Sequence, residues 1–205
     1  MLDVSPVFFC YNVLMNFWLY ILLGYLSGSI PVGYLVAKWR GIDIRKTGSG
    51  NIGATNITRN LGWGAGIAVF ALDFFKGAAP TLLALSYLKD PLPVVLVGLA
   101  AIAGHSFSIF LKGKGGKGAA TGLGVLCVIA PDILLFTLIL VAILIFTTRY
   151  VSVGSILGAV SVAALMFILG KPLPYIIVSL LAAALIVVRH IPNIKRLMAG
   201  TERKI

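Results

Sequence analysis

Long charge-free runs of apolar residues divide the chain and predict helices that cross a membrane. Three runs of 21 residues carry no charge: 17–37, 91–111 and 150–170. An α-helix rises about 1.5 Å per residue, so each run can cross roughly 30 Å of hydrocarbon. Residues 60–88 form a further segment, interrupted by Asp73 and Lys76. Residues 172–188 form another, near the lower limit of length for a transmembrane helix.

Residues 119–148 have two interpretations: one long tilted helix, or two short helices that meet at Pro131-Asp132. With the break, the chain forms about seven transmembrane helices. An amino terminus outside then places all but three of the 17 lysines and arginines on one face. Because cations are enriched in cytoplasmic loops, we expect this arrangement, with a cytoplasmic carboxyl terminus. A five-helix alternative moves Arg149 outside and needs a very long final helix.

Composition agrees with an all-α integral membrane protein, a polytopic helix bundle. The mean hydropathy is +1.04 and 60% of the 205 residues are hydrophobic, far outside the soluble range. We therefore predict one membrane domain over residues 1–205. Residues 1–14 resemble an N-terminal extension before an alternative start at Met15, and we assign them no function. Cys10 and Cys127 lie in apolar segments and are interpreted as small buried hydrophobes.

The net charge is +11, from 17 Lys and Arg against 6 Asp and Glu. In a soluble protein this surplus would suggest a nucleic-acid partner. In a membrane protein it indicates an anionic leaflet or an anionic substrate instead. We therefore expect contact with membrane lipid and no nucleic acid.

A first group of glycines, at 48, 50 and 53, follows the first apolar run. Its G-x-G-x-x-G spacing does not indicate dinucleotide binding, because no strand precedes it and no βαβ unit can follow. A glycine-rich turn before a helix still offers backbone N–H groups to an anion, and Arg59 lies close behind. Asn51 and Asn56 can bind phosphate or hydroxyl oxygens, or cap the helix. A tight interfacial loop without a ligand is the alternative.

A second group, residues 112–118, combines three lysines with four glycines. It lacks the spacing of a nucleotide P-loop, but it places N–H groups and ammonium groups ahead of a helix. That arrangement suits a phosphate monoester. The alternative is a positive-inside signal without a ligand, which the glycines make less convincing.

A third group follows the last apolar run and contains Arg189, His190 and Asn193. His190 is the better candidate for chemistry, whereas His105 lies among apolar residues and is more often structural there. Asp73 and Lys76 are three residues apart on one helical face. Because single charges are costly within a bilayer, we expect them to form a structural ion pair rather than a proton relay.

These three groups resemble the motifs of the bacterial membrane glycerol-3-phosphate acyltransferases that use acyl phosphate, the PlsY family. The resemblance covers about residues 24–205. It rests on segments 27–31 with 48–59, 104–107 with 114–118, and 189–194 with 200–202. Their length and order make a chance match improbable.

The resemblance implies roles for individual residues. It implies catalytic or supporting roles for Ser49, Arg59, His190 and Asn193. It implies substrate or phosphate contacts for Gly48, Gly50, Asn51, Asn56, Lys114, Gly115, Gly116, Lys117, Gly118, Ser152 and Ser155. The second motif would hold glycerol 3-phosphate. Glu202 would be structural, beside the expected pair of Asp73 and Lys76.

The implied reaction moves a fatty acyl group from acyl phosphate to the 1-hydroxyl of glycerol 3-phosphate. It yields lysophosphatidic acid and phosphate, the first step of phospholipid synthesis. The chain has no His-x-x-x-x-Asp pair, and a mixed anhydride already has a good leaving group, so we expect direct attack without an acyl-enzyme. No metal or other cofactor is expected.

We expect a monomer in the bacterial inner membrane, with the active site on the cytoplasmic face. A small anion transporter is the main alternative, but the polar motifs on one face and the lack of an inverted repeat argue against it. A phosphatidyl-transferring enzyme would need clustered aspartates for a metal, and the acidic residues here are scattered.

Overall fold

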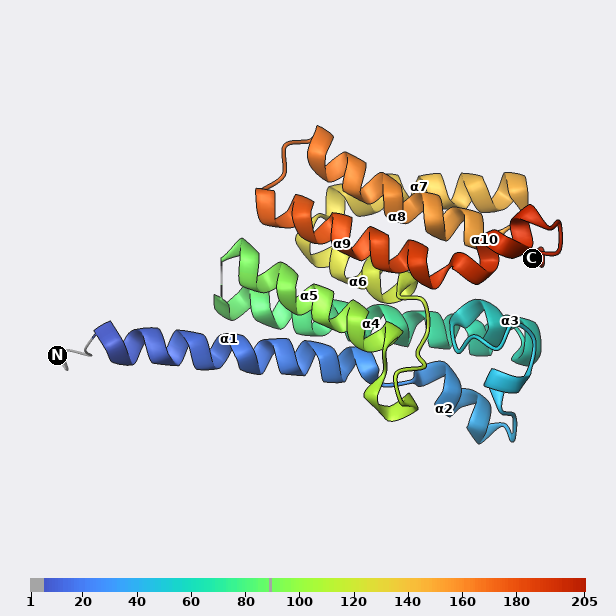
Figure 1. The fold of residues 1–205 in the computed structure, drawn as a ribbon, viewed down its shortest axis with the longest axis horizontal. Helices are drawn as coiled ribbons and strands as arrows, with labels where there is room; N and C mark the ends of the chain where they lie inside the picture. The colour runs from blue at the N-terminus through green and yellow to red at the C-terminus, as the bar shows by residue number, and fades with distance from the viewer. Residues whose placement is uncertain (1–5, 89) are drawn as a thin grey trace.

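The computed structural model describes the backbone of residues 6–88 and 90–205, and the side chains of 17–88 and 90–205. Regular structure in these residues is helical, as the all-α class predicts. Seven longer helices lie side by side in a bundle (Figure 1). They are α1 (Pro6–Ser29), α4 (Trp63–Leu88), α5 (Pro91–Ser106), α6 (Ala119–Ile129), α7 (Pro131–Thr148), α8 (Val151–Ile168) and α9 (Leu173–Arg189). The described side chains do not include those of the expected N-terminal extension, residues 1–14 with Cys10, or that of Lys89.

Prolines end two of the predicted segments. Pro131 begins α7 directly after Ala130, so residues 119–148 form two helices rather than one. Pro31 separates α1 from α2 (Val32–Trp39), whereas the sequence predicted an unbroken run over 17–37. A proline donates no backbone hydrogen bond and disfavours the helical conformation of the preceding residue, so a helix usually ends before it.

Within the part of the chain that the structure describes, five segments are long and apolar enough to cross a membrane: Phe17–Trp39, Trp63–Leu88, Pro91–Leu111, Pro131–Thr148 and Val151–Ile168. α9 and the short α10 (Ile191–Met198), bent by 55° against each other, form a sixth candidate. α6 has 11 residues and a length of about 16 Å, roughly half of the hydrocarbon thickness. All seven predicted apolar segments are therefore helical, and five or six can span.

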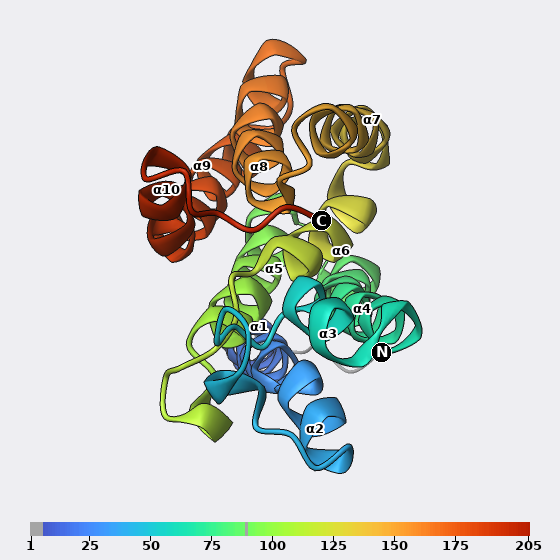
Figure 2. The ribbon, with the colours of Figure 1, turned by 90° about the vertical axis from the view of Figure 1, so that its right-hand side faces the viewer.

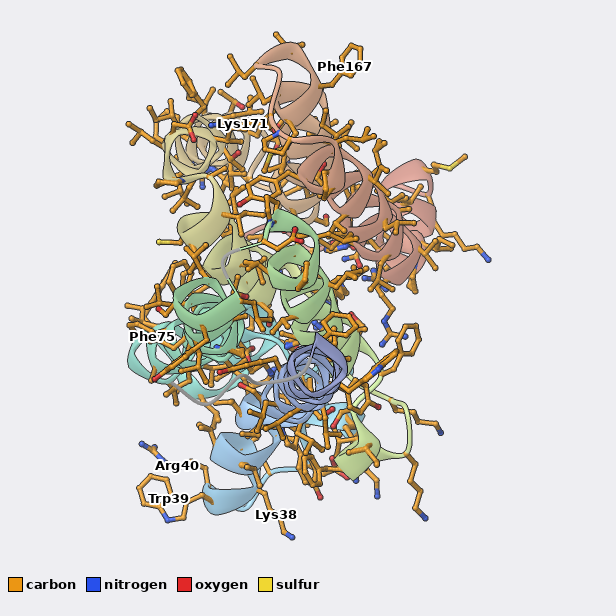
Figure 3. All side chains as sticks on the ribbon, turned by 90° about the vertical axis from the view of Figure 1, so that its left-hand side faces the viewer. Lys38, Trp39, Arg40, Phe75, Phe167 and Lys171 are labelled. Atoms are coloured by element: carbon orange, nitrogen blue, oxygen red, sulfur yellow. The ribbon has the colours of Figure 1, made fainter. Side chains whose placement is uncertain are left out.

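Small residues bring the helices into close contact. A Cβ atom on Gly28 of α1 would lie 2.0 Å from the Ala101 carbonyl oxygen of α5, and one on Gly124 of α6 would lie 2.0 Å from that of Phe74 on α4. Close backbone approach at glycine is typical of packing in membranes. Large apolar side chains point outward instead, as Phe167 does in Figure 3, where 73% of its surface is exposed.

The polar loops gather at one end of the bundle, on the right in Figure 1 and facing the viewer in Figure 2. This end holds α3 (Ala54–Leu61), α10 and the carboxyl terminus. At the end of the bundle seen in Figure 3, Lys171 pairs with Asp132 at 2.7 Å. The fold therefore assembles the three predicted motifs at one surface.

Candidate active site

A cavity of about 190 Å³ opens among the polar loops. All three sequence motifs and the start of α8 contribute to its wall. The predicted site residues that line it are Ser49, Asn51, Asn56, Arg59, Asp73, Lys117, Gly118, Ser152, Ser155, His190, Asn193 and Glu202. Residues separated by up to 153 positions in the sequence, Ser49 and Glu202, thus meet around one space.

The first loop is shaped by Asn56, which is 1% exposed. Its side-chain oxygen accepts from the Ser49 N–H at 3.0 Å, and its amide nitrogen donates to the carbonyls of Asn51 at 2.9 Å and Thr47 at 3.1 Å. Gly48 has a φ of +61°, and a Cβ there would lie 2.2 Å from the Asn56 oxygen. Asn56 therefore organises the loop, rather than offering a free amide to a substrate as the sequence predicted.

Arg59 links the first motif to the end of the chain. It lies on α3 and lines the cavity, and its Nη2 donates to the carbonyl oxygen of Arg203 at 2.8 Å. The backbone after α10 thus holds the guanidinium beside Ser49. Both residues also line a smaller adjoining pocket together with Arg196 and Glu202.

In the second loop, backbone groups use part of the predicted anion site. The N–H groups of Gly115 and Gly116 donate to the carbonyls of Ser106 at 3.2 Å and His105 at 2.9 Å. These two N–H groups are therefore used within the fold, and a contact of Gly115 or Gly116 with substrate stays a prediction. Lys114 is exposed and does not line the cavity.

The N–H groups that remain open belong to residues 117–120, at the start of α6. Among the described residues, none of the four has a hydrogen-bond acceptor in the protein, and all four residues line the cavity. The positive end of a helix with open N–H groups favours an anion. Within the second motif, the open N–H groups thus begin one residue after its glycine pair.

Lys117 supplies the charge at this helix start, and its Nζ donates to the side-chain oxygen of Asn193. Burial lowers the pKa of Lys117 from 10.5 to about 8. Glu202 opposes this shift, whereas the positive charges of Arg196 and Arg59 add to it. The ammonium is therefore easier to deprotonate than an exposed lysine.

Glu202 connects the third motif to α8. Its carboxylate accepts from Asn193 Nδ2 at 2.6 Å, Arg196 Nε at 2.7 Å and Ser152 Oγ at 2.9 Å. Burial alone would raise the pKa of Glu202, but these three hydrogen bonds outweigh it and lower the pKa. Glu202 therefore stays ionised and orients Asn193, in line with its predicted structural role.

His190 lies between α9 and α10 and is 3% exposed. Its Nδ1 faces the carbonyl of Ile186 at 2.8 Å, and a carbonyl can only accept, so Nδ1 carries the proton. Burial and the charge of Lys117 lower the pKa of His190 to about 4. The imidazole is thus neutral at pH 7, with a lone pair on Nε2.

An apolar cavity of about 100 Å³ adjoins the polar one. The two share Ala119, Leu123, Val141 and Ser155. From there the apolar cavity continues between α6, α7, α8 and α9 as far as Met166. A polar head and an apolar tail of one molecule can therefore lie in connected spaces.

Sequence reasoning did not assign roles to Arg189 and Arg196. Arg189 donates to the carbonyls of Gly115 at 2.8 Å and Gly116 at 3.0 Å, and Arg196 holds Glu202. The signal available was their position in the third cationic group, directly after a long apolar run. Their partners lie on other elements and could not be identified from spacing.

A family model described as glycerol-3-phosphate acyltransferase matches residues 18–200. A glycerol-3-phosphate acyltransferase of Thermus thermophilus is 46% identical over 185 residues, covering 90% of this chain and 93% of the relative. Another, of Aquifex aeolicus, is 41% identical and covers 90% and 96%.

Two crystal structures of PlsY, an integral membrane glycerol 3-phosphate acyltransferase, share the fold. The glycerol 3-phosphate form has a TM-score of 0.90 and 40% identity, covering 93% of this chain and 96% of that one. The lysophosphatidic acid form has a TM-score of 0.87 and 39% identity, with coverage of 93% and 95%.

Proposed function

The chain belongs to the glycerol-3-phosphate acyltransferase family, and we propose that it takes the acyl group from acyl phosphate. The product is lysophosphatidic acid and the leaving group is phosphate. The observation that carries this proposal is the continuity of the polar cavity with the apolar one. An acyl phosphate has a phosphate head and a fatty tail, and these connected spaces match both parts.

Two groups of anion-binding atoms support the use of two phosphorylated substrates. One consists of Lys117 and the open N–H groups of residues 117–120. The other consists of Ser49, Arg59 and Arg196 around the adjoining pocket. Following the family resemblance, we place glycerol 3-phosphate at the first group.

His190 is our proposed proton acceptor. The 1-hydroxyl oxygen of glycerol 3-phosphate attacks the acyl carbonyl carbon, and the bond from that carbon to the phosphate oxygen breaks. The hydroxyl proton moves to His190 Nε2 or to a phosphate oxygen. Lys117 and Arg59 stabilise the phosphates and the charge that develops on the carbonyl oxygen. Asn193 orients Lys117.

The protein is a bacterial multi-pass membrane protein, and we propose that the site faces the cytoplasm. The positive-inside rule supports this orientation, because nearly all of the cations are predicted on the same side as the three motifs. Lys38, Trp39 and Arg40 project from α2 in Figure 3, and such a cation–aromatic group suits a lipid headgroup region. We also propose that one chain suffices for activity, since a single chain supplies every group named here.

Phosphate release tests the donor. Purified protein in detergent receives glycerol 3-phosphate with either palmitoyl phosphate or palmitoyl-CoA. We expect release of phosphate and formation of lysophosphatidic acid with palmitoyl phosphate only. Lys117→Ala should abolish turnover, while Lys114→Ala, an exposed lysine of the same loop, should keep it. Turnover with palmitoyl-CoA alone would overturn the proposed donor and leave the acyltransferase family assignment intact.

A further inference from the structure

A buried cluster of three ionisable side chains packs against the second loop, and two of its members, Asp73 and His105, also lie in the wall of the polar cavity. Lys76 Nζ and Asp73 Oδ1, both on α4, are 2.8 Å apart, so the predicted pair forms. His105, in the last turn of α5, places Nδ1 at 3.7 Å from the same carboxylate oxygen. Lys76 also donates to the Ile30 carbonyl at 2.9 Å, at the break between α1 and α2. All three side chains are less than 7% exposed.

The imidazole of His105 has one orientation that suits these surroundings. At 3.7 Å, its contact with Asp73 is longer than a hydrogen bond but within range of a strong charge–dipole attraction. Asp73 Oδ1 is held by the Lys76 ammonium, whereas His105 Nδ1 has no hydrogen-bond partner among the described residues. A proton on Nδ1 therefore faces the carboxylate, and Nε2 points away from it.

The second loop packs directly on this imidazole. A Cβ atom on Gly116 would lie 2.1 Å from His105 Nε2 and 2.9 Å from Cε1. A Cβ on Gly115 would lie 2.0 Å from the backbone oxygen of His105 instead. The loop backbone thus rests on the His105 ring at one glycine and on its carbonyl at the other.

Arg189 binds the second loop at the same two glycines that pack on His105. Its guanidinium donates to the carbonyls of Gly115 and Gly116 and lies over the ring of Phe107 at 5.4 Å. The next residue is Lys117, followed by the open N–H groups of α6. A tilt of the imidazole would therefore move the cation and the helix start that face the cavity.

We propose that His105 is a positioning residue for the reaction, with Asp73 orienting its imidazole. The ring fixes the position of Gly116 and so directs Lys117 and the N–H groups of residues 117–120 toward the substrate phosphate. Lys76 balances the charge of the buried carboxylate, which would be costly alone. This inference rests on the proposed placement of glycerol 3-phosphate at the start of α6.

The two glycines provide a matched test. In Gly116→Ala the new methyl group meets the His105 ring, and His105→Ala removes that ring. In Gly115→Ala it meets the His105 backbone, which His105→Ala leaves in place. We expect each single substitution to displace Lys117 and the N–H groups that contact the phosphate. The KM for glycerol 3-phosphate should therefore rise on the order of tenfold.

The proposal is tested by whether the increases in KM add when two substitutions are combined in one protein. We expect Gly116→Ala to add no further increase in KM when His105→Ala is present, whereas Gly115→Ala should add its full increase. Equal, additive effects in both pairs would overturn the proposal.

His105→Asn, which keeps a donor near the position of Nδ1, should recover part of the affinity that His105→Leu loses. Val94→Ala, at a fully buried position earlier on α5, should lower the Tm without changing this KM. A His105→Leu variant that behaved like Val94→Ala would show a merely structural role.

A binding measurement separates this proposal from the proposed function. Glycerol 3-phosphate alone, without any acyl donor, should raise the Tm of the wild-type protein. Loss of that protection in His105→Leu supports the positioning role, and full protection contradicts it. If wild-type protein is not protected, the placement of glycerol 3-phosphate itself fails.

Discussion

The side chain of Asn193 joins Lys117 to Glu202, with its oxygen accepting from the ammonium and its nitrogen donating to the carboxylate. The bond between Lys117 and Asn193 joins residues 76 positions apart, and the bond to Glu202 extends the connection from the loop before α6 to the segment after α10. An amide side chain offers a donor and an acceptor at the two ends of one planar group. The orientation of the Lys117 side chain therefore depends on the third motif.

We expect Asn193→Asp to disrupt this arrangement although it hardly changes the side-chain volume. Aspartate has no N–H group, so one of its oxygens would face the Glu202 oxygen at the distance of a former hydrogen bond. We expect kcat/KM to fall about 100-fold, as for other lost positioning groups, together with a lower Tm. Adding Glu202→Gln restores a donor to the pair and should recover most of the Tm. No recovery would contradict the amide's bridging role.

The pH dependence of kcat/KM should reflect the protonation state of Lys117. Its pKa is lowered to about 8, so the charged form that attracts phosphate is present below pH 8 and lost above it. We expect kcat/KM to fall above pH 8, by about tenfold per unit at higher pH. The arginine of Lys117→Arg keeps its charge over this whole pH range. The kcat/KM of that variant should therefore not fall above pH 8, even if its rate is lower. If kcat/KM of Lys117→Arg fell above pH 8 as in the wild-type protein, the titrating group would be a residue other than Lys117.

Arg59 should not be replaceable by lysine. Its Nη2 donates to the Arg203 carbonyl while the guanidinium lines the cavity. A lysine carries a compact charge on a single ammonium group, so it cannot bind the Arg203 carbonyl and face the cavity at the same time as a guanidinium can. We expect Arg59→Lys to lower kcat/KM about 100-fold. Arg45→Lys is the matched control, since Arg45 pairs with Asp43 at 2.9 Å and lines none of the site cavities. A similar loss in both variants would indicate a general effect of charge.

The membrane architecture could be largely predicted from sequence. Apolar runs and prolines carry strong local information, so the two helices around Pro131 and the gathering of three motifs at one end are borne out. The break at Pro31 was missed, because the charge-free run continues through it. Pro31 ends the helix locally, and the carbonyl of the preceding Ile30 accepts from Lys76, 46 residues away.

Details of the site could be predicted less well. Sequence motifs identify residue types that suit phosphate, but they do not show which groups the protein itself uses. The amide of Asn56 and the N–H groups of Gly115 and Gly116 are taken up within the fold. The open N–H groups at residues 117–120 lie at the start of α6, where the sequence predicted the beginning of a helix. Contacts such as Arg189 with Gly116 join residues 73 positions apart.

The apolar cavity should determine which acyl chains are used. Ser155 lies where the two cavities meet, and Met166 lies further along the apolar one on the same helix. Eleven residues separate them, a distance of about 16 Å along α8. A Cβ on Gly158, between them, would lie 2.6 Å from Val141 Cγ2, so Gly158→Leu should fill the cavity partway along.

This geometry predicts opposite effects of two substitutions on donors of different length. Gly158→Leu should lower kcat/KM for palmitoyl phosphate at least tenfold and spare octanoyl phosphate, because only the longer chain passes the blocked point. Met166→Ala opens space at the far end and should favour chains longer than palmitoyl. The KM for glycerol 3-phosphate should change little in either variant, since that substrate has no tail. Equal losses for octanoyl and palmitoyl phosphate in Gly158→Leu would place the acyl chain elsewhere.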